Sequence, residues 1–136
     1  MCSSDLIFPD DMNKCGRIRD GTYDLSLTFH HKNGTPTAAD LVVKTQGDLR
    51  PALTVNNCGA VPVVSNNPGK TTSFGINVHN GWSNTSTGSE GCLTIQPSDW
   101  TRFIRIFLDL YPDLSDWYEG NGSWRGRRIG TLNVRA

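Results

Sequence analysis

The sequence has no excess of charge of either sign and no long hydrophobic run. Lysine and arginine number 13 together, as do aspartate and glutamate, so the formal net charge at pH 7 is zero. A balanced charge of this kind does not favour binding to nucleic acid or to an anionic membrane surface. No apolar stretch is long enough to cross a bilayer. We therefore expect no nucleic-acid partner and no membrane span.

The chain is also too short for two ordinary domains, and its start lacks the pattern of an export signal. A length of 136 residues allows one hydrophobic core. The first residues, MCSSDLIFPDDMNKCG, do not run from a positively charged segment into an apolar one. The 14 glycines, with β-branched clusters between Asn, Ser and Thr, predict a β-rich fold with many turns. We expect an N-terminal extension at 1–20 and a single catalytic domain at 21–136.

Alternating apolar and polar residues predict one long strand. In GTYDLSLTFHHKNGTP the apolar side chains fall on every second position from Tyr23 to Phe29, the period of a half-buried strand, and 32–36 predicts a turn. His30 and His31 follow, and we expect them to point to opposite faces as a solvated pair at a sheet edge. The sequence has no Cys-x-x-Cys or His-x-x-x-His spacing, so no metal site is expected.

Shorter strands are predicted farther along the chain. They are bounded by Gly, Asn or Pro and span Leu41 to Val43, Leu53 to Val55 and Val61 to Val64. In SFGINVH the apolar residues at 74, 76 and 78 are expected to share the core face, so His79 lies at the strand end and points away from the core. A last strand is predicted in RRIGTLNVRA.

One helix is predicted in QPSDWTRFIRIFLDLYPDL. Apolar residues recur there at helical spacing from Trp100 to Tyr111. Pro97 suits the first turn, Asp99 complements the helix dipole, and Pro112 ends the helix. The expected fold class is mainly β with one principal helix.

A histidine and a cysteine stand at the two ends of a polar loop in HNGWSNTSTGSEGC. A cysteine thiol, with a pKa of about 8.5, is mostly protonated at neutral pH, and an imidazole that accepts its proton makes it a nucleophile. His79 and Cys92 are suited to these two roles. Gly88 and Gly91 let the backbone bend tightly near the sulfur and leave amide groups to bind an oxyanion. The loop therefore predicts an acyl-transfer site.

The stretch INVHNGWSNTSTGSEGCLTI resembles the signature of the L,D-transpeptidase catalytic domain family. In that signature a histidine is followed, after a variable gap, by Ser or Thr, commonly His, then Gly and the nucleophilic Cys. The matching residues are His79, Ser89, Gly91 and Cys92. The order of strands and helix is also similar from about Gly21 onward. Glu90 replaces the common second histidine and Thr94 a frequent arginine, which indicates a divergent branch. Such branches include small toxins delivered between bacteria and phage-encoded wall enzymes.

The resemblance implies a fold and a reaction. The fold would be an L,D-transpeptidase-like β-sandwich or sheet, with the helix after the catalytic cysteine. Cys92 would attack the amide after the third residue of a peptidoglycan stem peptide, with His79 as the base. Ser89 and the amides around Gly91 would complete the site, and the thioester would pass to an amine or to water. The reaction requires no metal or organic cofactor. Trp82, Asn80 and Glu90 are the expected substrate contacts.

The expected location is the periplasm or the outside of the cell, where stem peptides lie. If the chain is an effector toxin, we also expect an immunity or delivery protein as a partner. The alternative function is a secreted, β-rich, disulfide-bonded module that binds the cell wall or a protein without catalysis. The four cysteines leave the pairing open. Cys15 with Cys58, or Cys2 with Cys15, would tether the N-terminal extension, and Cys58 is also a rival nucleophile to Cys92.

Overall fold

The computed structural model describes residues 6–7, 17–31, 33–66, 68–69, 71–80, 93–120, 124 and 126–135. Six strands form one sheet in the order β1-β8-β7-β4-β3-β9, and three form another in the order β2-β5-β6. The strands are β1 (Leu6–Ile7), β2 (Arg17–Ile18), β3 (Gly21–His30), β4 (Arg50–Val55), β5 (Val61–Val64), β6 (Thr72–Ser73), β7 (Asn77–Asn80), β8 (Leu93–Ile95) and β9 (Arg128–Val134). The helices are α1 (Pro97–Leu110) and α2 (Leu114–Trp117), with single 3-10 turns η1 (Ala38–Asp40) and η2 (Asn56–Cys58). The expected class, mainly β with one main helix, is confirmed.

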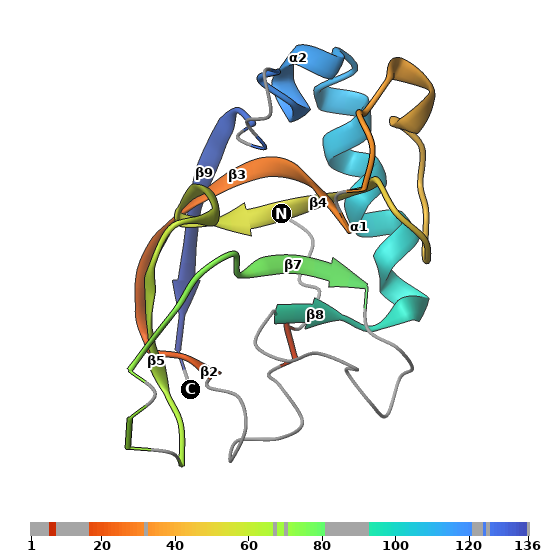
Figure 1. The fold of residues 1–136 in the computed structure, drawn as a ribbon. Coiled ribbons are helices and arrows are strands. Elements are labelled where there is room, and N and C mark those ends of the chain that lie inside the picture. Colours follow the sequence, from red (N-terminus) through yellow and green to blue (C-terminus); the bar gives the residue numbers. More distant parts are fainter. Residues whose placement is uncertain are drawn as a thin grey trace.

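The long strand predicted from alternation is β3, which pairs with β4 on one side and β9 on the other. Its residues Leu25, Leu27 and Phe29 are buried and belong to the hydrophobic core. Figure 1 shows β3, β4, β7 and β8 running side by side, with α1 beside them at the right of the view. Strands β7 and β8 are parallel, whereas the other paired strands among the described residues are antiparallel.

Helix α1 begins and ends as its sequence predicts. Pro97 occupies the first turn, where its missing amide proton costs nothing, and the helix stops at Leu110, two residues before Pro112. Trp100 and Ile104 are buried in the core shared with the sheet. The helix is therefore held by its apolar face, and it follows directly on β8.

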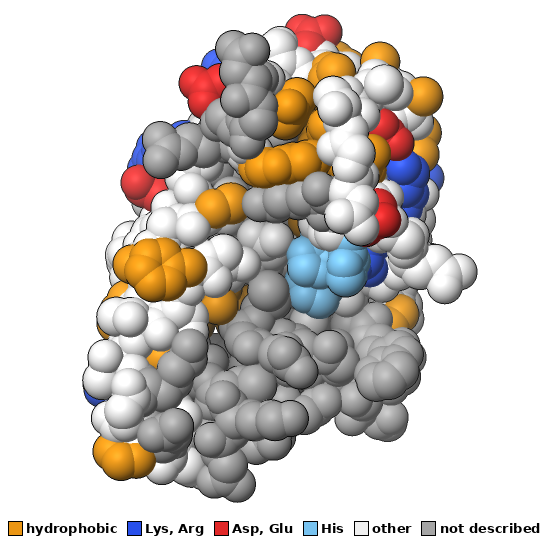
Figure 2. Space-filling view, in the orientation of Figure 1, with side chains coloured by type: hydrophobic (Ala, Val, Ile, Leu, Met, Phe, Trp, Pro, Cys, Tyr) orange, Lys and Arg blue, Asp and Glu red, His pale blue; other side chains and the backbone are white. Residues whose placement is uncertain are grey.

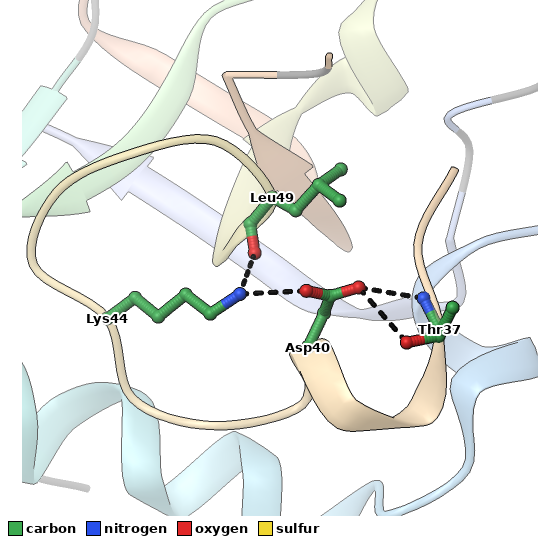
Figure 3. Close-up of polar contacts among 4 residues, drawn as sticks. All are labelled: Thr37, Asp40, Lys44 and Leu49. Carbon is green, nitrogen blue, oxygen red and sulfur yellow. Dashed lines mark hydrogen bonds and ion pairs between the residues drawn. The ribbon is translucent and has the colours of Figure 1, made fainter. Parts of the chain in front are cut away.

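The segment at 31–49 connects β3 to β4, and its described residues, 31 and 33–49, contain no strand, so the strand predicted for Leu41 to Val43 is wrong. The segment is instead ordered by the contacts in Figure 3. Asp40 accepts a hydrogen bond from the Thr37 amide at 2.8 Å and pairs with Lys44 Nζ at 2.8 Å. Lys44 also donates to the Leu49 carbonyl at 3.3 Å. Leu49, in turn, donates its amide to the His31 carbonyl at 2.8 Å, which closes the segment.

The expectation that Phe74 faces the core is also wrong. Ile76 and Val78 are buried, but Phe74 is 72% exposed. Gly75 lies between Phe74 and Ile76 with a φ of +64°, a conformation that extended strands do not contain. This left-handed residue interrupts the two-residue period, so alternation cannot be extended back through it.

Candidate functional site

One face of the six-stranded sheet is polar although it is buried. Ser26, Thr54 and Asn77 form a row across β3, β4 and β7, and His79 pairs with Thr94 between β7 and β8. All five are at most 8% exposed. Because successive side chains of a strand point to opposite faces, the apolar residues of the same strands lie on the other face, with the core. Buried polar side chains add little to hydrophobic stabilisation, which favours a functional role for this face.

His79 lies on this face, in β7, with its ring held in one tautomer. Its Nδ1 atom is 2.8 Å from the backbone oxygen of Asn80. A carbonyl oxygen can only accept a hydrogen bond, so Nδ1 carries the proton and donates it. The neutral ring then has its lone pair on Nε2. His79 is therefore fixed in the form that accepts a proton at the far side of the ring.

The surroundings also keep this ring neutral. The pKa of His79 is lowered from 6.5 to about 4; burial is the largest cause, the hydrogen bond to Asn80 opposes it, and the neighbouring Arg50 and His31 side chains contribute in the same direction as burial. At neutral pH the imidazole is almost entirely unprotonated. It can therefore accept a proton, although a pKa of about 4 makes it a weak base.

The histidines of the chain, three in number, lie together. The rings of His30 and His79 stack with centroids 4.1 Å apart and planes 14° apart, and the His31 centroid is 4.3 Å from that of His30. Figure 2 shows them as a single pale blue patch. The expectation that His30 and His31 point to opposite faces is wrong, because His31 has a left-handed φ of 55° and leaves the strand alternation.

His30 is also held by a neighbour on the polar face. The Asn77 amide nitrogen, a donor, lies 3.1 Å from His30 Nδ1. His30 Nδ1 is therefore the acceptor of this hydrogen bond, the opposite arrangement to that in His79, where Nδ1 donates. Within the described ranges, no group of three or more His, Cys, Asp or Glu side chains is arranged to hold a metal ion.

Only part of the predicted site falls within the described residues. His79 and Asn80 are described, whereas Cys92, Ser89, Gly91, Trp82 and Glu90 lie outside them. Asn80 is buried, and its side-chain amide donates to the Thr45 carbonyl. The register of β8 bears on the predicted pair: Leu93, which follows Cys92 in the chain, pairs with Val78, the residue before His79. The described strands thus place the positions that flank both predicted groups side by side.

Cys58 is the one cysteine among the described residues. It lies in η2, where Asn56, Asn57 and Cys58 all have left-handed φ values between 50° and 66°. Its amide donates to Thr54 Oγ1 at 2.9 Å, which ties this turn to the polar face. Cys2 and Cys15 lie outside the described residues, so the predicted pairings remain predictions.

No family model, curated protein or solved structure matches the chain. Among the helices of the described ranges, none has the length and apolar character to cross a membrane. Function is therefore inferred from the residues of the chain itself and from the geometry around His79.

Sequence reasoning missed two neighbours of His79 on other elements. The position of His30 could have been predicted, because it continues the polar side of β3 after Thr28. The position of Arg50 could not, because its place beside the site depends on how the segment at 31–49 folds. In this arrangement, His79 Nε2 can accept a proton from a group that binds at the polar face.

Proposed function

We propose that the chain is a cysteine acyltransferase that acts on peptidoglycan stem peptides through a thioester at Cys92. One observation carries the proposal: His79 is buried, neutral and held by Asn80 with Nε2 as its proton acceptor, on the strand beside the start of β8. The covalent chain limits the Cα atom of Cys92 to about 3.8 Å from that of Leu93. The pairing of Leu93 with Val78 therefore supports a thiol within reach of His79.

The reaction follows from these groups. The Cys92 thiol gives its proton to His79 Nε2, and the sulfur attacks the carbonyl carbon of the amide after the third stem residue. The carbon–nitrogen bond breaks, and the imidazolium returns its proton to the departing amine. Attack of an acceptor amine on the thioester gives transpeptidation or exchange, and attack of water gives trimming. In each case sulfur leaves and regains a proton.

The low pKa of His79 indicates when the proton moves. A thiol with a pKa of about 8.5 gives up its proton unfavourably to an imidazole whose pKa is about 4. The resting pair is therefore thiol and neutral imidazole, and the proton is transferred as the sulfur attacks. This is general-base catalysis, in contrast to a thiolate–imidazolium pair formed in advance.

The substrate class also sets the expected location and partners. Stem peptides lie in the cell-wall compartment, so we propose a periplasmic or secreted protein. If it acts on the wall of another cell, it requires a delivery protein and its producer an immunity protein.

The test is incubation with purified muropeptides that carry tetrapeptide stems, read by mass spectrometry. Loss of the terminal D-Ala would indicate trimming, replacement by an added D-amino acid exchange, and dimers joined between third residues transpeptidation. Cys92→Ala and His79→Gln are expected to abolish every product. Cys58→Ala is the matched control and is expected to retain them. No product from the wild-type protein, with Cys92 found in a disulfide, would instead support the binding module.

A further inference from the structure

Arg50 is a buried arginine that interacts electrostatically with Asp48 but is within ion-pair distance of no acidic side chain that the structure describes. It is 7% exposed. Its Nε atom is buried without a hydrogen-bond acceptor in the described part of the chain, and burial lowers its pKa while Asp48 raises it. Arginines are rarely buried without a paired charge, because the guanidinium loses its hydration. Because this loss of hydration is unfavourable, we expect Arg50 to have a role that compensates for it.

The contacts that Arg50 does make lead to His79. Its NH1 group donates to the Asn80 side-chain oxygen at 3.0 Å and to the Thr45 carbonyl at 3.2 Å. The Asn80 side-chain amide donates to the same Thr45 carbonyl at 2.6 Å. Arg50, Asn80 and Thr45 thus form a closed triangle of hydrogen bonds. Asn80, whose side chain is held in this triangle, also supplies the backbone oxygen that accepts a hydrogen bond from His79 Nδ1.

Arg50 also acts on His79 through its charge. Desolvation is the largest cause of the low pKa of His79, and the positive charge of Arg50 adds to it. His31 lowers the same pKa, while the hydrogen bond to Asn80 raises it. His30 stacks on the ring, and Asp48 is the acidic group that interacts with Arg50. A guanidinium keeps its charge throughout the working pH range, so its influence does not vary with pH.

We propose that Arg50 is a positioning residue for His79: through Asn80 it fixes the carbonyl that sets the imidazole tautomer, so that Nε2 stays the proton acceptor. The Thr45 carbonyl, which accepts hydrogen bonds from Arg50 and Asn80, belongs to the segment at 31–49. Contacts of Asp40 and Lys44 hold that segment in place, so they also help to position His79. The placement of His79 is independent of any reaction, whereas its catalytic consequence rests on the proposed function.

The test is nitrogen NMR of histidine-labelled protein, in which only three imidazoles give signals. The two ring nitrogens report the tautomer at pH 7, and their change with pH reports the titration midpoint. In Arg50→Met, His79 is expected to become a mixture of tautomers, and its midpoint is expected to change, because loss of the Arg50 charge raises the pKa while weakening of the Asn80 hydrogen bond lowers it. Arg50→Lys keeps the charge but not the planar guanidinium, so we expect a mixed tautomer with a midpoint below that of the wild type, because the hydrogen bond to Asn80 that raises the His79 pKa is weakened.

Two further variants complete this test. Asn80→Ala keeps Arg50 but removes the side chain between it and His79, and it is expected to behave like Arg50→Lys. Arg102 is an exposed arginine on α1 that pairs with Asp99, so Arg102→Met is the matched control and is expected to change neither property. Circular dichroism checks that each variant is folded. If Arg50→Lys and Asn80→Ala both keep the pure Nδ1–H tautomer, the proposal is wrong.

An activity measurement separates positioning from direct substrate binding. With muropeptide substrate, Arg50→Met is expected to lower kcat, to move the acidic limb of the pH profile in the same direction as the His79 midpoint, and to leave KM within about twofold. A raised KM with an unchanged His79 spectrum would overturn the proposal in favour of direct binding by Arg50. If the wild type has no activity but the spectra change as expected, the positioning role stands and the proposed reaction fails.

Discussion

Acidification is expected to destabilise the folded chain through His79. The pKa of this side chain is about 4 when folded and 6.5 when exposed, so between these values the unfolded chain binds more protons than the folded chain. The free energy of unfolding must therefore fall as the pH falls through this window. The stabilisation is fully present above pH 6.5 and is lost by about pH 4. At about 1.4 kcal/mol for each unit of difference in pKa, the loss amounts to about 3 kcal/mol.

The assay is urea unfolding at pH 7 and pH 4, followed by tryptophan fluorescence, for the wild type and His79→Gln. Glutamine keeps a polar side chain but does not titrate, so the variant is expected to lose about 3 kcal/mol less than the wild type on acidification. Other groups that take up protons in this range, including Asp40 with its lowered pKa, are common to both proteins and cancel in the comparison. Equal losses in the two proteins would refute the buried, neutral state of His79.

Two further predictions concern the framework of the site. Gly126→Ala is expected to lower the free energy of unfolding by at least about 2 kcal/mol, because a Cβ atom there would overlap the Leu27 carbonyl oxygen. Gly130→Ala, where a Cβ atom meets nothing within 4 Å, is the control in thermal melts, and equal melting temperatures would contradict the packing. Lys44→Met is expected to raise the pKa of Asp40, which Lys44 lowers by a hydrogen bond, and to cost about 1 kcal/mol. Carboxyl NMR titration measures the change, and an unaltered Asp40 midpoint would contradict the Lys44–Asp40 contact shown in Figure 3.

The regular elements could be predicted because their signals are local and repeated. The period of two in β3 and the helical period with Pro97 in α1 both recur over several residues, and packing against one core satisfies each pattern. The strand expected at Leu41 to Val43 had apolar residues but no partner strand. Leu41 and Val43 pack against the core from an irregular segment, whereas Val42 is exposed, so hydrophobicity alone did not distinguish the two outcomes.

The site could be predicted only in part, and for a related reason. His79 was found because the histidine precedes a loop with a cysteine, a pattern visible in the chain. The approach of His30, His31 and Arg50 was not visible, because it depends on left-handed residues such as His31 and Leu49 and on pairing between distant strands. Alternation assumes an unbroken strand, and a single positive φ removes its predictive value.

The parallel pairing of β7 with β8 constrains how the connection between them can evolve. Two parallel neighbours cannot be joined by a tight hairpin, since the chain must return along the full length of the first strand before the second begins, and such crossovers usually need about a dozen residues. The 12 residues at 81–92 are about this length. Insertions are therefore tolerable, whereas deletions bring the connection below the usual length of a parallel crossover. In lineages that descend from this protein, the connection can lengthen and change its composition, but it has little room to shrink.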